Sequence, residues 1–204
     1  YYTPEFLVDH LVRATLGEKL KDCKTPSDAL KLRILDPACG SGTFLVRAFE
    51  EFKQWYLKQH TEGEQTKLDF ENDSGLSSFL DSVLQNCIYG IDLDPRAVRL
   101  AKLNLFLRAI DTPNQLPRLK ILHKNSLVWD DDFPRPFKFE RDFPHVHEAG
   151  GFDVVIGNPP WEKWKPDSHE FFDELHPGFK SLPAQEAKKV MEAIMKTIAG
   201  VRKK

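Results

Sequence analysis

The 204-residue sequence is poor in cysteine, with only three residues, and has no long uninterrupted apolar run. Cys23, Cys39 and Cys87 lie far apart and form no Cys-x-x-Cys pair, so we expect reduced thiols rather than disulfides or a zinc site. No segment approaches the roughly 18 to 20 apolar residues of a membrane span, and the N-terminus lacks a basic patch followed by a short apolar run. These absences favour a cytoplasmic protein with no membrane partner and no metal.

The sequence also lacks a large excess of either charge. It holds 29 Lys and Arg against 31 Asp and Glu, which gives a formal net charge of −2. Nucleic-acid binding relies on Lys and Arg that neutralise phosphates, so the whole surface is not a nucleic-acid footprint. If DNA is the partner, another part must hold it. Because a functional-looking segment begins at once with Tyr1, we expect a piece of a longer protein.

Apolar periodicity predicts strands that alternate with helices. The predicted strands cover residues 32–36, 88–92, 119–123 and 152–156. The predicted helices cover residues 3–20, 44–55, 76–85, 95–109, 170–175 and 183–201. Such alternation is typical of an α/β, Rossmann-like doubly wound sheet, mostly parallel, here with an N-terminal helix and a C-terminal helical extension.

Local signals mark the ends and interruptions of these elements. Thr3-Pro4 and Asp94-Pro95 each read as a capping residue followed by proline at the first helical position. Residues 60–75 are polar and acidic and predict a loop insertion, while residues 130–151 combine prolines with charges and predict a long irregular loop. We therefore expect a catalytic core at residues 1–161 and a helical extension at residues 162–204.

The first unusual turn follows the first predicted strand, as Asp36-Pro37-Ala38-Cys39-Gly40-Ser41-Gly42. In doubly wound sheets, ligands bind beyond the carboxyl ends of the strands, and the glycines let the backbone approach a ligand closely. Alone, this turn is weak evidence. A simple strand-to-helix connection or a nicotinamide-dinucleotide site explains it about as well as a binding turn for another ligand. The dinucleotide pattern requires a third glycine where this chain has Leu45.

The second turn places Asp92 at the end of the next predicted strand. A carboxylate there can accept hydrogen bonds from both ribose hydroxyls of an adenosyl ligand. The alternative is a helix cap, for which Asp94 is better placed. Asp92 lies 56 positions after Asp36, against a usual spacing of about 20, and the insertion at residues 60–75 accounts for the excess.

The most specific signal is Asn158-Pro159-Pro160-Trp161 after the fourth predicted strand. Two prolines stiffen the turn and remove two amide donors, so an amide side chain and a rigid carbonyl can together accept both hydrogens of an exocyclic amine. Trp161 offers a flat face for stacking on a base drawn out of its helix. The plainer alternative is a proline-rich loop with a core tryptophan.

These motifs together resemble the S-adenosylmethionine-dependent amino methyltransferases of DNA, in the form carried by large bacterial restriction-modification and phage-defence enzymes. The resemblance spans most of the chain through five ordered motifs: residues 2–4, 36–45, 89–95, 125–127 and 158–161. It implies transfer of a methyl group to the N6 amine of a flipped-out adenine. It also implies DNA as partner, read by a region outside this chain, with a fused nuclease or specificity domain as a further expectation, and a bacterial cytoplasmic location.

The resemblance also implies roles for individual residues. The expected cofactor-binding set is Tyr2, Thr3, Asp36, Pro37, Ala38, Gly40, Gly42, Thr43, Asp92, Leu93, Asn125 and Ser126. Within it, Thr3 would contact the methionine carboxylate, Asp92 the ribose and Leu93 the adenine. Asn125 stands where the family commonly has Asp. The expected catalytic set is Asn158, Pro159, Pro160 and Trp161.

Other functions remain open at this stage. The same Asn-Pro-Pro-aromatic chemistry serves enzymes that methylate protein glutamine amides or RNA base amines. A cofactor-binding fragment that is inactive without the rest of the chain is a further alternative, and a catalytically silent binding or scaffold module is another. His145 and His147 form a His-x-His pair without metal-ligand partners at suitable spacing, and we expect them in a solvated loop.

Overall fold

The computed structural model describes residues 3–60, 74–108, 118–128, 134–159, 172–173 and 175–201. The chain forms two compact units, Tyr1–Pro160 and Trp161–Lys204. The elements of the first unit are α1 (Glu5–Val12), a π-helical turn η1 (Arg13–Gly17), α2 (Glu18–Lys21), α3 (Pro26–Ala29), β1 (Ile34–Asp36), α4 (Thr43–His60), α6 (Ser74–Asn86), β2 (Ile88–Asp92), α7 (Pro95–Arg108), β3 (Lys120–His123), α8 (Phe139–Asp142), α9 (Pro144–Glu148) and β4 (Val154–Val155).

The four strands form one parallel sheet in the order β3-β2-β1-β4. The register pairs Leu35 with Tyr89 on one side and with Val155 on the other. This arrangement confirms the predicted Rossmann-like α/β class. β2 has the predicted bounds, whereas β1, β3 and β4 are shorter than predicted.

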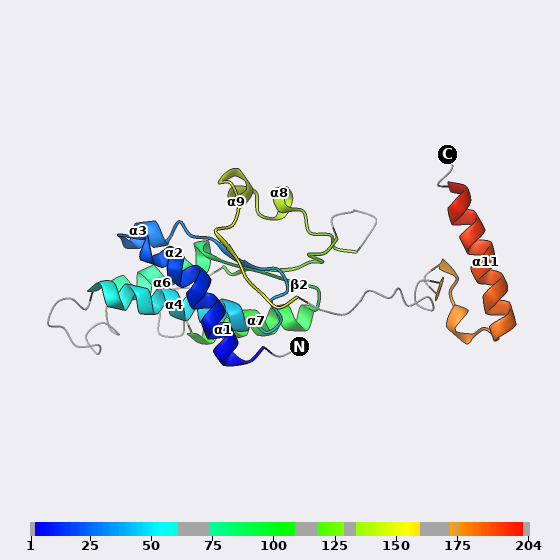
Figure 1. Cartoon of the computed structure of the whole chain (residues 1–204), viewed down its shortest axis with the longest axis horizontal. Helices are drawn as coiled ribbons and strands as arrows, with labels where there is room; N and C mark the ends of the chain where they lie inside the picture. The colour runs from blue at the N-terminus through cyan, green and yellow to red at the C-terminus, as the bar shows by residue number, and fades with distance from the viewer. Residues whose placement is uncertain are drawn as a thin grey trace. The chain divides into compact units, whose positions relative to one another are not determined.

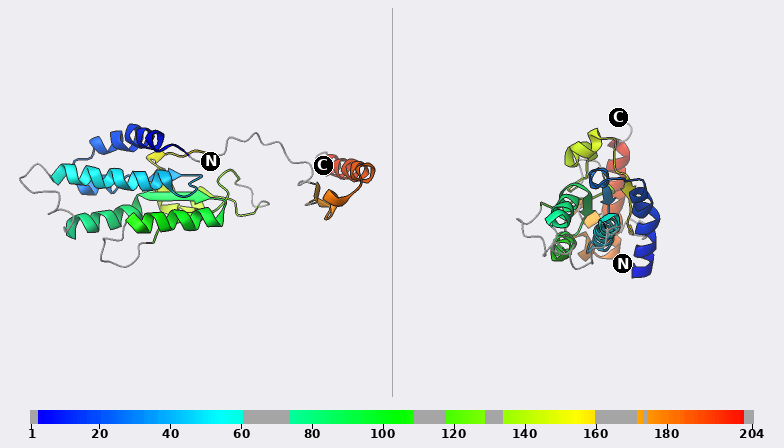
Figure 2. Two further views of the ribbon diagram at one scale, coloured as in Figure 1. Left: turned by 90° about the horizontal axis from the view of Figure 1, so that it is seen from below. Right: turned by 90° about the vertical axis from the view of Figure 1, so that its left-hand side faces the viewer.

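One face of the sheet is covered by a helical layer in which α4 contacts α1, α6, α7 and the central strands (Figures 1 and 2). Its apolar core includes Phe49 and Phe52, both fully buried. Gly90 of β2 faces this layer, and a Cβ there would lie 2.8 Å from Cδ1 of Leu45 and 3.0 Å from Cδ1 of Ile121. Glycine therefore lets α4 pack directly on the centre of the sheet.

The opposite face is covered by α8 and α9, where the sequence predicted only an irregular loop at residues 130–151 (Figure 1). Phe143 packs edge-on against Tyr89 at 5.0 Å between ring centroids, and Val146 is fully buried beside them. The prolines and charges concealed this burial, because Pro144 begins α9 rather than breaking a helix. The loop prediction is therefore wrong over these residues.

His145 is likewise tied to the sheet rather than simply solvated. Its Nε2 lies 2.7 Å from the hydroxyl of Tyr89 and 3.1 Å from Nζ of Lys120. The Lys120 ammonium also donates to the Tyr89 hydroxyl at 3.0 Å. These contacts pin α9 to the amino ends of β2 and β3.

Of the two predicted helix caps, one is confirmed and the other is wrong. Asp94 caps α7, since its Oδ1 accepts from the amide of Arg96 at 2.8 Å. Thr3 does not cap α1, because Pro4 occupies the N-cap position and the first helical residue is Glu5. The N-terminal helix also continues as η1 and α2 rather than as one uniform α-helix.

In the second unit, the described elements are a 3-10 turn η2 (Phe179–Ser181) and α11 (Ala184–Val201). The rings of Phe172 and Phe179 are buried and lie 5.3 Å apart between centroids. The predicted helix at residues 183–201 is confirmed as α11. Half of the predicted helix at 170–175 and most of the polar insertion at 60–75 lie outside the described residues. Within the described part of the chain, no helix has the length and apolar character needed to span a membrane.

Candidate functional site

Most of the predicted site residues that the structure describes lie in turns at the carboxyl edge of the sheet, around the point where the strand order reverses. β1 pairs with β2 on one side and with β4 on the other, so the segments leaving β1 and β4 diverge from the middle of the sheet. In open parallel sheets a ligand-binding crevice forms at such a point, beyond the carboxyl ends of the strands. The turns after β1, β2 and β4 all start at this edge.

The turn after β1 is shaped by two glycines with left-handed backbone conformations. Gly40 has φ 54° and Gly42 has φ 85°, and the Gly42 amide donates to the Cys39 carbonyl at 2.7 Å. A Cβ on Gly42 would lie 3.1 Å from Cα of Ala101, so α7 crosses directly over this position. At Gly40, by contrast, a Cβ would meet nothing within 4 Å. Gly40 thus leaves bare backbone facing open space.

Asp92 joins this turn to the end of β2. Its Oδ2 accepts from the Gly40 amide and its Oδ1 from the Asp94 amide, both at 2.8 Å. Each carboxylate oxygen has two lone pairs, so both keep acceptor capacity for a further donor. The next residue, Leu93, is 58% exposed at the same edge. The structure thus brings together a bare backbone turn, a carboxylate and an exposed apolar side chain.

Asp36 lies buried between the turns after β1 and β4, with an exposed fraction of only 1%. Its Oδ1 accepts from the Ala38 amide at 3.0 Å, and a Cβ built on Gly157 would collide with this same oxygen. Burial raises the pKa of Asp36 to about 7, and the nearby Asp92 carboxylate adds to the rise. Gly157 therefore permits the closest approach between the two turns.

Asn158 follows Gly157 and reaches the very start of the described chain. Its Nδ2 donates to Oγ1 of Thr3 at 3.2 Å, across 155 positions of sequence. Pro159 is exposed beside it. The remaining members of the two predicted sets at these ends, Tyr2, Pro160 and Trp161, lie outside the described residues.

In the turn after β3, the predicted residues mainly stabilise the turn itself. Oδ1 of Asn125 accepts from the Leu127 amide at 3.1 Å, and the Asn125 backbone bridges to Pro136. Ser126 lines a small pocket of about 460 Å³ together with Phe137 and Phe139. The Lys124 amide donates to the Asp92 carbonyl at 3.0 Å, which keeps this turn beside the end of β2.

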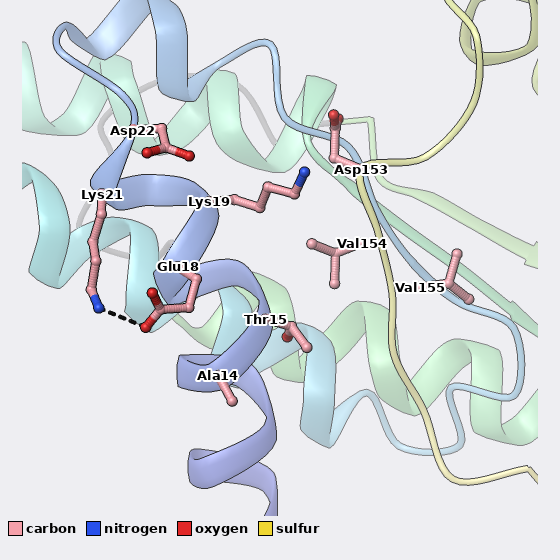
Figure 3. A pocket seen from close by; sticks show the side chains of 9 residues that line it. All are labelled: Ala14, Thr15, Glu18, Lys19, Lys21, Asp22, Asp153, Val154 and Val155. Carbon is pink, nitrogen blue, oxygen red and sulfur yellow. Dashed lines mark hydrogen bonds and ion pairs between the residues drawn. The ribbon is translucent and has the colours of Figure 1, made fainter.

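A separate groove of about 580 Å³ lies between the η1–α2 segment and the outer edge of β4. Figure 3 shows Val154 and Val155 on one side of it and Thr15 and Lys19 on the other. Among the described residues that line it, none belongs to the predicted site. Among the described residues, no three His, Cys, Asp or Glu side chains form a group suited to a metal ion.

Sequence reasoning missed two features of the site. Gly157 was not singled out, although a glycine immediately before Asn158 is the signal of a close backbone approach. Asn104 was also missed, and its Nδ2 donates to the Ser41 carbonyl at 2.9 Å, which ties α7 to the first turn. Nothing in the local sequence distinguishes Asn104 from another polar helix residue.

The sequence matches two protein families. Residues 86–191 match the Eco57I restriction-modification methylase family, and residues 26–121 match the RMKL-like methyltransferase domain. The first match covers slightly more than half of the chain, and together the two matches cover all three strand-end turns after β1, β2 and β4.

Among curated proteins, the chain is 29% identical over 174 residues to the type II restriction enzyme and methyltransferase RM.Eco57I of Escherichia coli, which covers 78% of this chain and 17% of that protein. It is 25% identical over 210 residues to the adenine-specific methyltransferase PglX of Streptomyces coelicolor, and this match covers 86% of this chain and 16% of that protein. It is 28% identical over 137 residues to the type I restriction enzyme EcoEI methylase subunit of E. coli, and this match covers 67% of this chain and 20% of that protein. The chain thus spans about a fifth or less of these relatives.

Proposed function

The chain belongs to the Eco57I restriction-modification methylase family, and from that membership we propose that it transfers a methyl group from S-adenosylmethionine to the N6 amine of a flipped-out adenine in DNA. The observation that carries the proposal is the meeting of Asn158, Thr3 and the glycine turn at one edge of the sheet. The adenine assignment is supported by the relative described as adenine-specific.

The residues after β1 and β2 fit the proposed cofactor. A Cβ would find open space at Gly40, so the backbone there accommodates a closely bound ligand. Asp92 retains lone pairs for ribose hydroxyls, and the exposed Leu93 offers an apolar surface for an adenine ring. When bound, the cofactor supplies a methyl group activated by a positively charged sulfonium.

The chain's own contribution lies at Asn158 and Pro159. The amide oxygen of Asn158 and the carbonyl of Pro159 would accept the two hydrogens of the target amine. These bonds free the nitrogen lone pair from conjugation and stabilise the positive charge that develops on nitrogen. Alignment of the two reactants supplies much of the remaining acceleration, and the methylated amine releases its extra proton to solvent once the thioether has left, so no dedicated base is required. Trp161 is proposed to stack on the flipped base, and Pro160 to stiffen the turn.

The rest of the assignment follows the same proposal. We place the catalytic core at residues 1–161 and a helical extension at 162–204, in a bacterial cytoplasmic enzyme. The part that reads the DNA sequence lies outside residues 1–204, and a nuclease or specificity domain accompanies it. The relatives' printed names, which combine restriction enzyme with methyltransferase, support this arrangement.

The first test is expression of the full-length protein in a bacterial host free of DNA methylation, followed by mapping of modified bases. We expect N6-methyladenine at one recurring sequence, and its loss in Asn158→Ala. Cofactor binding by that variant should stay nearly unchanged, because Asn158 acts on the amine. Asn86→Ala, an exposed position at the opposite edge of the sheet, is the matched control and should keep full methylation.

Two outcomes would contradict the proposal. An unmodified genome, from an expressed protein that binds cofactor, would shift the substrate to a protein glutamine or an RNA base amine, or leave a scaffold. Equal losses of cofactor binding and turnover in Asn158→Ala would remove Asn158 from the amine-binding role.

A further inference from the structure

The contact between Thr3 and Asn158 joins two segments that the backbone holds firmly. Val8 and Val12 bury α1 in the helical layer, and the amides of Leu7 and Val8 donate to the Pro4 carbonyl, which fixes the chain just after Thr3. On the other side, the Ile156 amide donates to the Leu35 carbonyl at 2.9 Å. The hydroxyl and the amide therefore meet because both main chains are anchored.

The two ends of a carboxamide have opposite hydrogen-bonding characters. Nδ2 only donates, whereas Oδ1 only accepts. An amine target requires Oδ1, so the orientation of the Asn158 side chain decides whether it grips or repels the amine. Oγ1 of Thr3 accepts from Nδ2, which turns Oδ1 away from Thr3, and the hydroxyl stays an acceptor here whenever its own hydrogen is donated elsewhere.

We infer that Thr3 is a positioning residue, whose hydroxyl holds the Asn158 carboxamide with Nδ2 toward Thr3 and Oδ1 on the side that would meet the target amine. The inference rests on the proposed function and goes beyond the cofactor contact that resemblance assigns to Thr3. A threonine hydroxyl carries one donor hydrogen and two acceptor lone pairs. Accepting from Asn158 therefore leaves its O–H to donate to a carboxylate, so one oxygen serves both the cofactor and the amine side of the site.

The test compares Thr3→Val and Thr3→Ser in the full-length protein. Valine keeps the shape and removes the hydroxyl, whereas serine keeps the hydroxyl. At saturating S-adenosylmethionine we expect Thr3→Val to lower kcat roughly threefold to tenfold, the scale of one neutral hydrogen bond, and Thr3→Ser to restore most of it. Thr15→Val is the matched control, because the Thr15 hydroxyl bonds the Leu11 carbonyl within its own helix at 2.7 Å.

A second readout does not depend on turnover. The side-chain amide hydrogens of Asn158, followed by nuclear magnetic resonance, should exchange with water faster in Thr3→Val than in the wild type or in Thr3→Ser. A residue that only contacts the cofactor would weaken cofactor binding and leave both kcat at saturation and this exchange unchanged.

The possible outcomes distinguish failure of the positioning role of Thr3 from failure of the proposed function. Wild-type activity with an unchanged kcat and unchanged amide exchange in Thr3→Val overturns the positioning role alone. Absence of methyl transfer to DNA by the wild type overturns the proposed function and the positioning role with it. A kcat loss repeated in Thr15→Val assigns the effect to general destabilisation and also overturns the role.

Discussion

Replacing Asp36 by Asn should stabilise the protein at and above neutral pH and flatten the pH dependence of its unfolding. Asp36 is almost completely buried, and its carboxylate touches the turns after both β1 and β4. Burial raises its pKa from 3.8 to about 7, with a smaller contribution from the Asp92 carboxylate. Ionisation of this group therefore opposes folding.

The sign and size follow from proton linkage. Between pH 3.8 and about 7 the folded state holds a proton that the unfolded chain has released, so stability falls as pH rises through this window. The full pKa difference corresponds to roughly 4 kcal/mol, of which roughly 2 kcal/mol is lost between about pH 5.5 and pH 8. Asn cannot ionise and keeps an oxygen that can accept from the Ala38 amide, so this loss should vanish.

Urea unfolding of the 204-residue chain, monitored by circular dichroism at several pH values, measures this difference. The free energies of unfolding of wild type and Asp36→Asn should converge below about pH 4 and separate progressively up to pH 8. Asp22→Asn, on the exposed surface, is the matched control and should follow the wild type. Parallel curves for wild type and Asp36→Asn would refute the argument that buried Asp36 carries the ionisation cost.

Two further predictions concern the packing of the unit. Gly157→Ala should destabilise the protein by about 1 to 3 kcal/mol in urea unfolding, because the new Cβ collides with the Asp36 carboxylate. Gly17→Ala in η1 is the control and should leave stability nearly unchanged, because a Cβ there has ordinary contacts. Equal destabilisation by the two substitutions would contradict the predicted clash. The contribution of His145 to stability should fall as pH is lowered from about 7.5 to 5, because burial and the Lys120 ammonium lower the pKa of His145, so the unfolded chain takes up this proton first. His145→Gln should weaken that pH dependence relative to His147→Gln, and identical profiles would refute the assignment.

The sheet could be predicted because its strands are short apolar runs that end at unusual turns. Ile88–Asp92 is the clearest case, with glycine and a terminal carboxylate inside one buried strand. The residues that cover the second face could not be predicted, since Pro144 and His145 separate Phe143 from Val146 and obscure any period. Burial there depends on aromatic packing against Tyr89, which is a tertiary effect.

In the candidate site, too, some features could be predicted from the sequence and others could not. Topology alone places the ends of β1, β2 and β4 at one edge, so the gathering of their turns was predictable. The contact of Thr3 with Asn158 was not, because it depends on how α1 packs on α4. The approach of Asp36 to Gly157 similarly depends on the pairing of β1 with β4, which no local pattern encodes.

Asp92 shows how closely the support of the turn and the proposed binding of cofactor are joined. Its two oxygens already accept from the amides of Gly40 and Asp94, which belong to the two turns that would embrace the ligand. Removing the carboxylate would leave both amides without this acceptor and release the glycine turn, in addition to deleting any ribose contact. A loss of cofactor binding in Asp92→Ala therefore has two physical sources. Asp92→Asn alters both at once, because its single amide oxygen can serve one backbone amide while the second position becomes a donor that repels the other.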